Sequence, residues 1–165
     1  MLTFEAIINR RSRRTFLAKT IERDAILKLI DAGRLAPTAR NVQPWEFVVV
    51  SNSKTLNHIA ELAENGRFIS DCSSCIAVFC QDTKYYLEDG CAATENILIA
   101  AEGLGLAACW VAGDKKPYCE NVREVLGVPA GYKLVSLIAL GFSEGPPAQT
   151  PPKRASKEVL HWEKW

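Results

Sequence analysis

The sequence has few of the features that mark membrane or secreted proteins. No apolar run approaches the roughly 18 residues that a membrane-spanning helix requires. The N-terminal segment MLTFEAIINRR lacks the apolar core of a secretory signal, so we expect a cytoplasmic protein with no membrane partner. Internal repeats, low-complexity tracts and a domain linker are also missing. With 165 residues, 48% of them apolar, the chain predicts one folded domain over residues 1–165.

An excess of charge of either sign is also missing. Twenty Lys and Arg residues balance nineteen Asp and Glu residues, which leaves a net charge of +1. Proteins that bind a nucleic-acid backbone usually have an extended basic surface. The balance therefore argues against a nucleic-acid partner, and any anion-binding site in this chain must be local.

Patterns typical of metal sites and disulfides are sparse. The six cysteines could form three disulfides, but the missing secretory signal favours reduced thiols. Cys72 and Cys75 form a CxxC pair, which is typical of a redox dithiol or of half a zinc site. No second CxxC follows, and the two histidines, His58 and His161, are far apart in the sequence. We therefore expect no metal, and a dithiol role for Cys72 and Cys75 is kept as an alternative.

Hydrophobic periodicity and turn residues predict helices and strands interleaved irregularly, as in an α+β or α/β sandwich. We expect Thr3 and Ser53 to cap the first and third helices. The continuous apolar run 75–80 predicts a strand covered on both faces. The expected helices cover about 3–10, 22–35, 53–65, 86–104 and 117–127, and the expected strands cover 45–50, 75–80 and 133–142, with 107–113 a short strand or an extended loop.

Two segments are difficult to explain as scaffold. The first is Arg10-Arg-Ser-Arg-Arg14, which contains four arginines and a serine in five residues. Guanidinium groups this close repel one another, and their planar donors suit an anion with several oxygens, such as a phosphate. A solvated charged face is the alternative. Phe16 follows at once, however, which indicates that the segment turns toward the core.

The second segment is the loop Ala36-Pro-Thr-Ala-Arg-Asn-Val-Gln-Pro-Trp45. Its two prolines restrict its shape, and Thr38, Asn41 and Gln43 offer hydroxyl and amide groups that donate and accept hydrogen bonds. Such a loop can bind the edge of a planar heterocycle, which makes these three residues candidates for cofactor binding. The alternative is a well-built turn in which Asn41 and Gln43 satisfy their own backbone.

These segments resemble motifs of the flavin-dependent nitroreductase family. Residues 10–16 match its RRSxRxF element, and residues 36–45 match its APSxxNxQPW element, with threonine for serine at position 38. Glu95-Asn96, the segment 104–113 and Lys153-Arg154 match in the same order, and the length resembles the short branch of the family. The resemblance implies an α+β, nitroreductase-like three-layer sandwich in which helices flank a central, mainly antiparallel sheet.

The resemblance also implies an intertwined homodimer with FMN at the subunit interface. Such an enzyme is an NAD(P)H-dependent FMN oxidoreductase: it would transfer two electrons from NADH or NADPH to a small-molecule acceptor, such as a nitroaromatic or a quinone, by a ping-pong mechanism. The C-terminal tail, residues 144–165, is expected to pack on the partner subunit. No catalytic side chain is implied, because the cofactor supplies the chemistry.

The resemblance assigns the FMN contacts to four parts of the chain. Arg10 and Ser12, with Arg11 as a further candidate, would hold the phosphate and ribityl chain, and Arg14 would lie near N1 and O2 of the ring. In the loop of the other subunit, the implied contacts to the ring and ribityl chain are Pro37, Thr38, Ala39 and Asn41. The backbone of Ala112 and Gly113 would face N5. Near the C-terminus, Lys153 and Arg154 would contact the phosphate.

Other functions stay open at this point. A flavin-binding protein could be a sensor, a storage protein or a specialised enzyme such as a dehalogenase. A module that binds a phosphate backbone through Arg10 to Arg14 is a further alternative. Within the main interpretation, Arg40 brings a positive charge to the mouth of the pocket, and we hypothesise that it selects anionic substrates.

Overall fold

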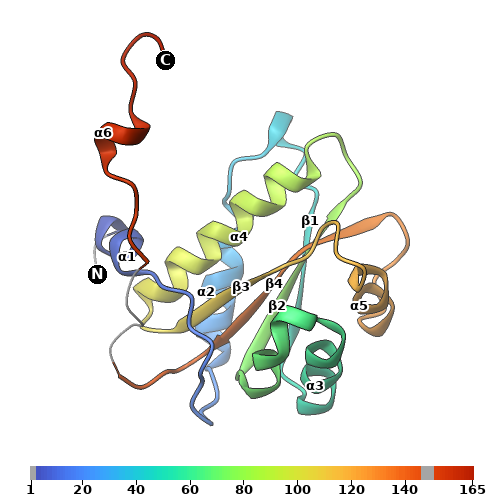
Figure 1. The fold of residues 1–165 in the computed structure, drawn as a ribbon. Coiled ribbons are helices and arrows are strands. Elements are labelled where there is room, and N and C mark those ends of the chain that lie inside the picture. Colours follow the sequence, from blue (N-terminus) through green and yellow to red (C-terminus); the bar gives the residue numbers. More distant parts are fainter. Residues whose placement is uncertain (1–2, 146–150) are drawn as a thin grey trace.

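A computed structural model describes residues 3–145 and 151–165 (Figure 1). Its described part contains a four-stranded antiparallel sheet in the order β1-β2-β4-β3. The strands are β1 Trp45–Val50, β2 Ser74–Gln81, β3 Ala107–Ala112 and β4 Tyr132–Gly141. The helices are α1 Thr3–Asn9, α2 Arg23–Arg34, α3 Ser53–Leu62, α4 Tyr86–Gly103, α5 Cys119–Val125 and α6 Ser156–Val159, with the 3-10 helices η1 Ala39–Asn41 and η2 Glu64–Asp71.

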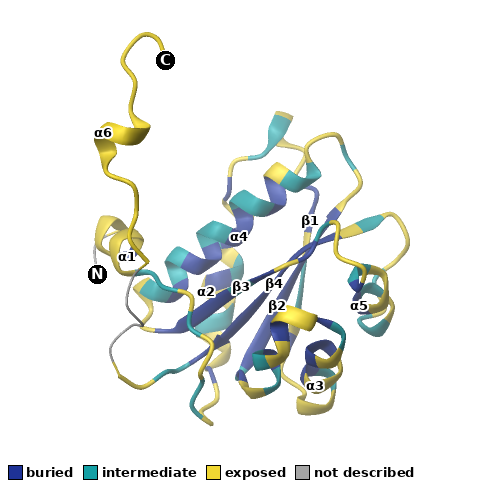
Figure 2. Ribbon diagram, in the orientation of Figure 1, coloured by how far each residue is buried: buried dark blue, intermediate teal, exposed yellow. Residues whose placement is uncertain are grey.

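Helices cover both faces of the sheet and create three layers (Figure 1). The even-numbered residues of 76–80 in β2 pack with α2 and α4, whereas the odd-numbered residues of 75–79 pack with α3, η2 and α5. Successive side chains of a strand point to opposite faces, so a strand between two helical layers is apolar throughout. Residues 75–80 are all buried (Figure 2), which confirms the predicted strand and the three-layer α+β sandwich.

The helix α4 lies close to the sheet at Gly90 and Thr94. A Cβ atom at Gly90 would come within 2.6 Å of a Val135 methyl group and 3.0 Å of the Cys80 sulfur. Thr94 Oγ1 donates to the Gly90 carbonyl over 2.7 Å or to Ser136 Oγ over 2.8 Å, so the buried hydroxyls satisfy each other. The small residues of α4 therefore let helix and sheet approach closely.

Several details of the helices differ from the sequence prediction: α3 ends at Leu62 and α5 spans Cys119–Val125, within the predicted ranges 53–65 and 117–127. The prediction that Ser53 caps the third helix is wrong: Asn52 is the cap, and its Oδ1 accepts from the N–H groups of Lys54 and Thr55 over 3.1 and 3.2 Å. Both residue types are good caps, and the asparagine one residue earlier has the extended backbone that the position needs. A further difference is η2, which was not predicted; it is a 3-10 helix interrupted by non-helical backbone at Gly66.

The C-terminal segment 151–165 projects from the body on the side of α1, and all of its residues are exposed (Figures 1 and 2). Trp162 is 78% exposed and Trp165 is fully exposed. Residues 146–150 of the predicted tail lie outside the described residues. No helix among the residues described has the length and apolar character needed to cross a membrane.

We predict opposite effects of two glycine substitutions in α4. Gly90→Ala forces a methyl group against Val135 and should lower the free energy of unfolding by about 1–3 kcal/mol, because a close-packed core tolerates extra volume poorly. Gly103→Ala meets no atom within 4 Å and should raise it by about 0.5 kcal/mol through a less flexible unfolded chain. Urea titration measures both; equal effects of the two variants would contradict the close approach at Gly90.

Candidate active site

The basic segment lies along the free edge of β3. Ser12 and Ala108 form an isolated parallel bridge, and the N–H of Arg13 donates to the Ala108 carbonyl over 2.9 Å. Because β3 is an edge strand, its outward-facing backbone groups are available for this pairing. The predicted turn toward the core is also present: the rings of Phe16 and Phe68 lie 6.5 Å apart. The arginines therefore have a fixed backbone and do not fray, although Ser12 and Arg14 are exposed.

The side chains of Arg10 and Arg11 differ in the strength of the contacts that they make within the chain. Arg10 Nε lies 3.5 Å from Glu95 Oε1, and both side chains are partly exposed, at 30% and 46%. A pair of this length and exposure is weak, so an anion with better geometry can replace it. Arg11 instead folds back, and its Nη1 donates to the carbonyls of Ile8 and Arg10 over 2.6 and 2.8 Å. Arg10 is thus the better placed of the two to bind an external anion.

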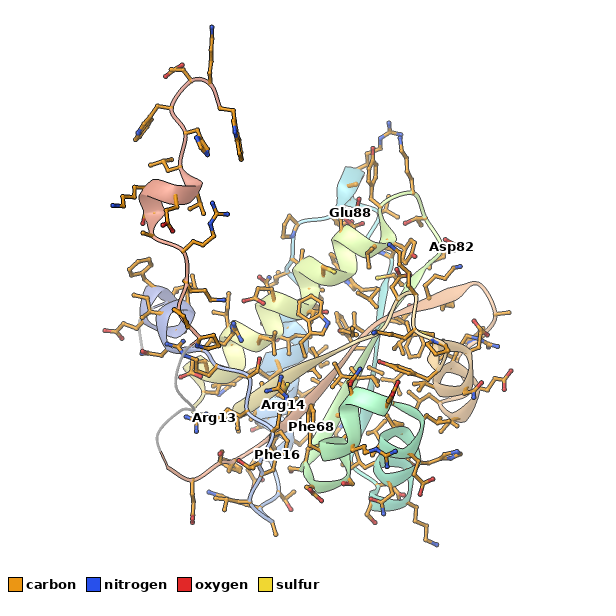
Figure 3. The ribbon with its side chains drawn as sticks, viewed as in Figure 1. Arg13, Arg14, Phe16, Phe68, Asp82 and Glu88 are labelled. Atoms are coloured by element: carbon orange, nitrogen blue, oxygen red, sulfur yellow. The ribbon has the colours of Figure 1, made fainter. Side chains whose placement is uncertain are left out.

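Arg14 is oriented by an aromatic ring. Its guanidinium carbon lies 5.8 Å from the centre of the Phe68 ring, and Figure 3 shows the two side chains next to each other. This distance is within the range of a cation–π contact. Phe68 comes from η2 and carries no recognisable signal in the sequence, so the sequence analysis missed it.

Cys109 lies beneath the same basic segment and is almost fully buried. Burial raises the pKa of its thiol, and Arg14, a hydrogen bond with Ser12 and Arg10 oppose that rise, in decreasing order. Arg10, Ser12 and Arg14 therefore all act on the Cys109 thiol, which places these three predicted residues near the same part of β3.

The end of β3 presents one backbone donor to the same edge. The Gly113 N–H donates to the Val135 carbonyl over 3.0 Å, so it is used inside the sheet. In an antiparallel pair the hydrogen-bonding direction alternates, so the backbone groups of Ala112 point to the open edge, where its carbonyl accepts from the buried Tyr118 hydroxyl. A Cβ atom at Gly113 would lie 2.5 Å from the Leu134 carbonyl oxygen, which requires glycine there. Of the predicted pair, Ala112 is the residue whose N–H faces outward.

Tyr86 joins the start of α4 to the loop after β3. Its hydroxyl donates to Asp114 Oδ1 over 2.6 Å. This hydrogen bond, followed by burial, raises the pKa of Tyr86 to about 12. The hydroxyl therefore keeps its proton at neutral pH and acts as a fixed donor.

The loop before β1 is held by a buried carboxylate. Asp89, which is 5% exposed, accepts from Thr38 Oγ1 over 2.8 Å and from the Ala39 N–H over 3.1 Å. Thr38 Oγ1 also accepts from the Gln43 N–H over 3.1 Å. The threonine at position 38 thus keeps the hydrogen bonds that a serine would make. Sequence analysis missed Asp89, because acidic residues are common in the first turn of any helix.

The same loop has an unusual backbone. Arg40, Asn41 and Gln43 have φ angles of 55°, 57° and 52°, in the left-handed region that non-glycine residues seldom adopt. Gln43 Nε2 donates to the Asn41 carbonyl over a long 3.4 Å. Part of the hydrogen-bonding potential of Gln43 is therefore used within the turn, as expected if the loop is simply a well-built turn. Backbone strain of this kind persists only where surrounding contacts fix it, and it is frequent at ligand sites.

The predicted residues form three groups that one chain does not bring together. The residues 10–14 lie at the edge of β3, with Ala112 and Gly113 further along that strand. The loop 37–43 leads into β1 at the opposite edge of the sheet, with β2 and β4 in between (Figure 1). Three strand spacings separate the two edges, roughly 14 Å. Lys153 and Arg154 lie on the exposed segment 151–165, where Arg154 donates to the Glu158 carbonyl.

The CxxC pair has none of the properties of a reactive dithiol. Cys72 and Cys75 are buried, and burial raises the pKa of Cys72 to about 11 and that of Cys75 well above its ordinary value. Both a dithiol relay and a zinc site need thiolates, which this environment disfavours. Within residues 3–145 and 151–165, no group of three or more His, Cys, Asp or Glu residues is arranged to hold a metal ion.

Comparison with known sequences identifies the family. The sequence model described as the Nitroreductase family matches residues 7–68 and 81–142. The chain therefore belongs to the nitroreductase family. The resemblance to this family that the sequence motifs indicated is confirmed. The matched ranges include the basic segment, the loop before β1 and the end of β3.

Individual relatives agree with this membership of the nitroreductase family. A protein of Archaeoglobus fulgidus, provisionally named NADH dehydrogenase/NAD(P)H nitroreductase, is 33% identical over 96% of this chain and 96% of its own. The FMN reductase (NADPH) of Bacillus subtilis is 27% identical over 98% of this chain and 73% of its own. The crystal structure of a Parabacteroides distasonis protein with the same provisional name as the first has a TM-score of 0.92 at 32% identity, over 99% of this chain and 98% of its own.

We predict that Asp89 is required to hold the nitroreductase-family loop in place. Asp89→Asn replaces one carboxylate oxygen by a donor that faces Thr38 or Ala39, and should lower the free energy of unfolding by about 1.5–3 kcal/mol. Glu88→Gln removes the same charge at the neighbouring exposed position and should change it by less than about 0.5 kcal/mol. Urea titration of both variants is the measurement. If they were equally stable, the anchoring role of Asp89 would be disproved.

Proposed function

We propose that this protein is an FMN-dependent oxidoreductase that transfers two electrons from NADH or NADPH to a small acceptor. Its membership of the nitroreductase family and the name of the B. subtilis FMN reductase support this function. The observation that carries the proposal is the edge of β3. Arginines and a hydroxyl lie at one end of that edge, and an outward-facing backbone donor lies at the other.

The dimensions and chemistry of this edge fit FMN. Ala108 and Ala112 are four residues apart on an extended strand, about 13 Å, a distance on the scale of an extended FMN molecule. Arg10 and Ser12 would bind the phosphate, because a guanidinium and a hydroxyl suit its oxygens. Arg14, oriented by Phe68, would lie near N1 and O2 of the ring, and the Ala112 N–H would point at the ring edge near N5.

FMN, when bound, would accept a hydride from NADH or NADPH and pass two electrons to an acceptor that enters after the nicotinamide leaves, a ping-pong cycle. The protein residues would bind and orient the reactants. A guanidinium at Arg14 favours negative charge on the adjacent ring edge. The protonated Tyr86 keeps Asp114 and the end of β3 in place. No side chain is assigned a catalytic proton transfer.

The proposal includes a homodimer with FMN between the subunits. In one chain the basic segment and the loop 37–43 are at opposite sheet edges, so Pro37, Thr38, Ala39, Asn41 and Gln43 would serve the site of the other subunit. The surface area also supports it: the chain exposes 10251 Å², whereas a compact 18.2 kDa monomer exposes about 8,100 Å². The difference exceeds the area that each partner buries in a standard interface.

The exposed apolar residues indicate where the partner would pack. Phe4 and Ile7 of α1 are 70% and 50% exposed, and the tail carries the exposed Trp162 and Trp165. Residues 1–165 would form one domain, and the tail would extend from it to cover the partner subunit. Lys153 and Arg154 of the tail would approach the FMN phosphate. We also propose a cytoplasmic location.

The absorption spectrum and size of the purified protein test the proposal. We expect flavin absorption bands, release of one FMN per chain on denaturation, and a mass in solution of twice the 18.2 kDa chain. Oxidation of NADH or NADPH should depend on an added quinone or nitroaromatic. A colourless monomer that cannot be reconstituted with FMN would disprove the proposal. A yellow dimer without turnover would favour a sensor or storage protein instead.

A further inference from the structure

A small pocket lies beside the strained loop, between the loop and the turn that precedes α4. Its volume is about 310 Å³, near the lower end of the range for small-molecule sites. This volume suits a molecule built on one aromatic ring and is too small for a whole dinucleotide. The pocket is lined by Ala39, Arg40, Val42, Thr83, Lys84, Tyr85 and Asp89.

The charges of this pocket are unbalanced. Arg40 and Lys84 both line it, and within the described residues neither has an ion-pair partner. The Lys84 amine lies only over the ring of the neighbouring Tyr85, 5.1 Å from its centre. Asp89 is the acidic residue among those that line the pocket, and its two carboxylate oxygens already accept hydrogen bonds from Thr38 Oγ1 and the Ala39 N–H. The pocket therefore offers two cations without a competing free carboxylate in its wall.

Acidic groups near the pocket leave this imbalance in place. Asp82 and Glu88 lie at the same end of the molecule (Figure 3). Asp82 is paired with Lys133, Oδ2 to Nζ at 3.4 Å. Glu88 is exposed and forms no ion pair with Lys84 in the described structure. Because solvent screens an exposed carboxylate, Glu88 weakens the field of Lys84 without cancelling it.

Arg40 belongs to the strained part of the loop and lines this pocket. Its φ of 55° is left-handed, and the residue before it is fixed by the hydrogen bond from the Ala39 N–H to Asp89. Strain held by a buried carboxylate indicates a function for the residue that it presents. Val42 and Tyr85, which are 51% and 40% exposed, supply apolar surface on which an aromatic ring can lie.

We propose that Arg40 and Lys84 select acceptors in which an aromatic ring carries an anionic group such as a carboxylate. The ring would lie against Val42 and Tyr85, and the carboxylate would meet the two cations. This inference rests on the proposed function, because it assumes that the loop 37–43 borders the flavin of the other subunit. The 2′-phosphate of NADPH offers the same anionic chemistry, and the experiment separates the two sources.

The test compares the kcat/KM for 4-nitrobenzoate with that for its neutral analogue 4-nitrobenzamide in the FMN-loaded protein. The variants are Arg40→Asn, which tolerates a left-handed backbone, Lys84→Ala and the double variant. The ratio of anionic to neutral acceptor should fall about threefold in each single variant and about tenfold in the double variant at low salt, since exposed charge pairs are individually weak. Addition of about 0.3 M salt should shrink the wild-type ratio. Lys54→Ala, an exposed charge on α3, is the matched control and should leave the ratio unchanged.

The outcomes separate this inference from the proposed function. Turnover of 4-nitrobenzamide with an unchanged acceptor ratio in the double variant overturns the inference and leaves the proposed function intact. A shift of the NADPH to NADH ratio, in place of the acceptor ratio, also overturns it and assigns the cations to the donor. If neither of these acceptors nor a quinone turns over, the proposed reductase function fails. Equilibrium dialysis of benzoate and benzamide then tests the pocket directly, and equal binding of the two refutes the inference.

Discussion

The pairing of the basic segment with the edge strand β3 is the constraint on which the candidate site depends. Four arginines in five residues would repel one another and fray if their backbone were free. The bridge between Ser12 and Ala108, and the hydrogen bond from Arg13, fix them as an extension of the sheet. Arg10 then faces a weak partner, Arg14 meets Phe68, and the outward-facing Ala112 follows on the same edge.

The order of the strands supports the proposal that a second chain completes the site at this edge. The loop 37–43 is fixed to α4 through Asp89 and continues into β1, so it cannot move to the β3 edge without loss of that anchor. A dimer resolves the separation without a change in either group. The large exposed surface and the projecting tail fit the same interpretation, since both leave apolar area for a partner to cover.

The sequence predicted most of the fold because its periodic signals are local. The apolar run 75–80 and the Ala-rich helix after Tyr86 were recognisable, and the family motifs led to Arg10, Ser12, Arg14 and the loop 37–43. The missed residues act through tertiary contacts. Phe68 comes from an irregular 3-10 helix, and Asp89 resembles any acid in a first helical turn. Gly113 was predicted as a site residue, but its hydrogen bond to Val135 depends on the pairing with β4.

Complementation in mixed dimers tests most directly whether each site is built from two subunits. One variant carries Arg10→Ala and Arg14→Ala, and the other carries Thr38→Ala and Asn41→Ala. Each variant alone should lose tight FMN binding. In a mixed dimer isolated with two affinity tags, one site combines both intact groups, so we predict one tightly bound FMN per dimer. If the mixed dimer binds no FMN tightly while the wild-type dimer does, each site is formed within a single chain and the account is wrong.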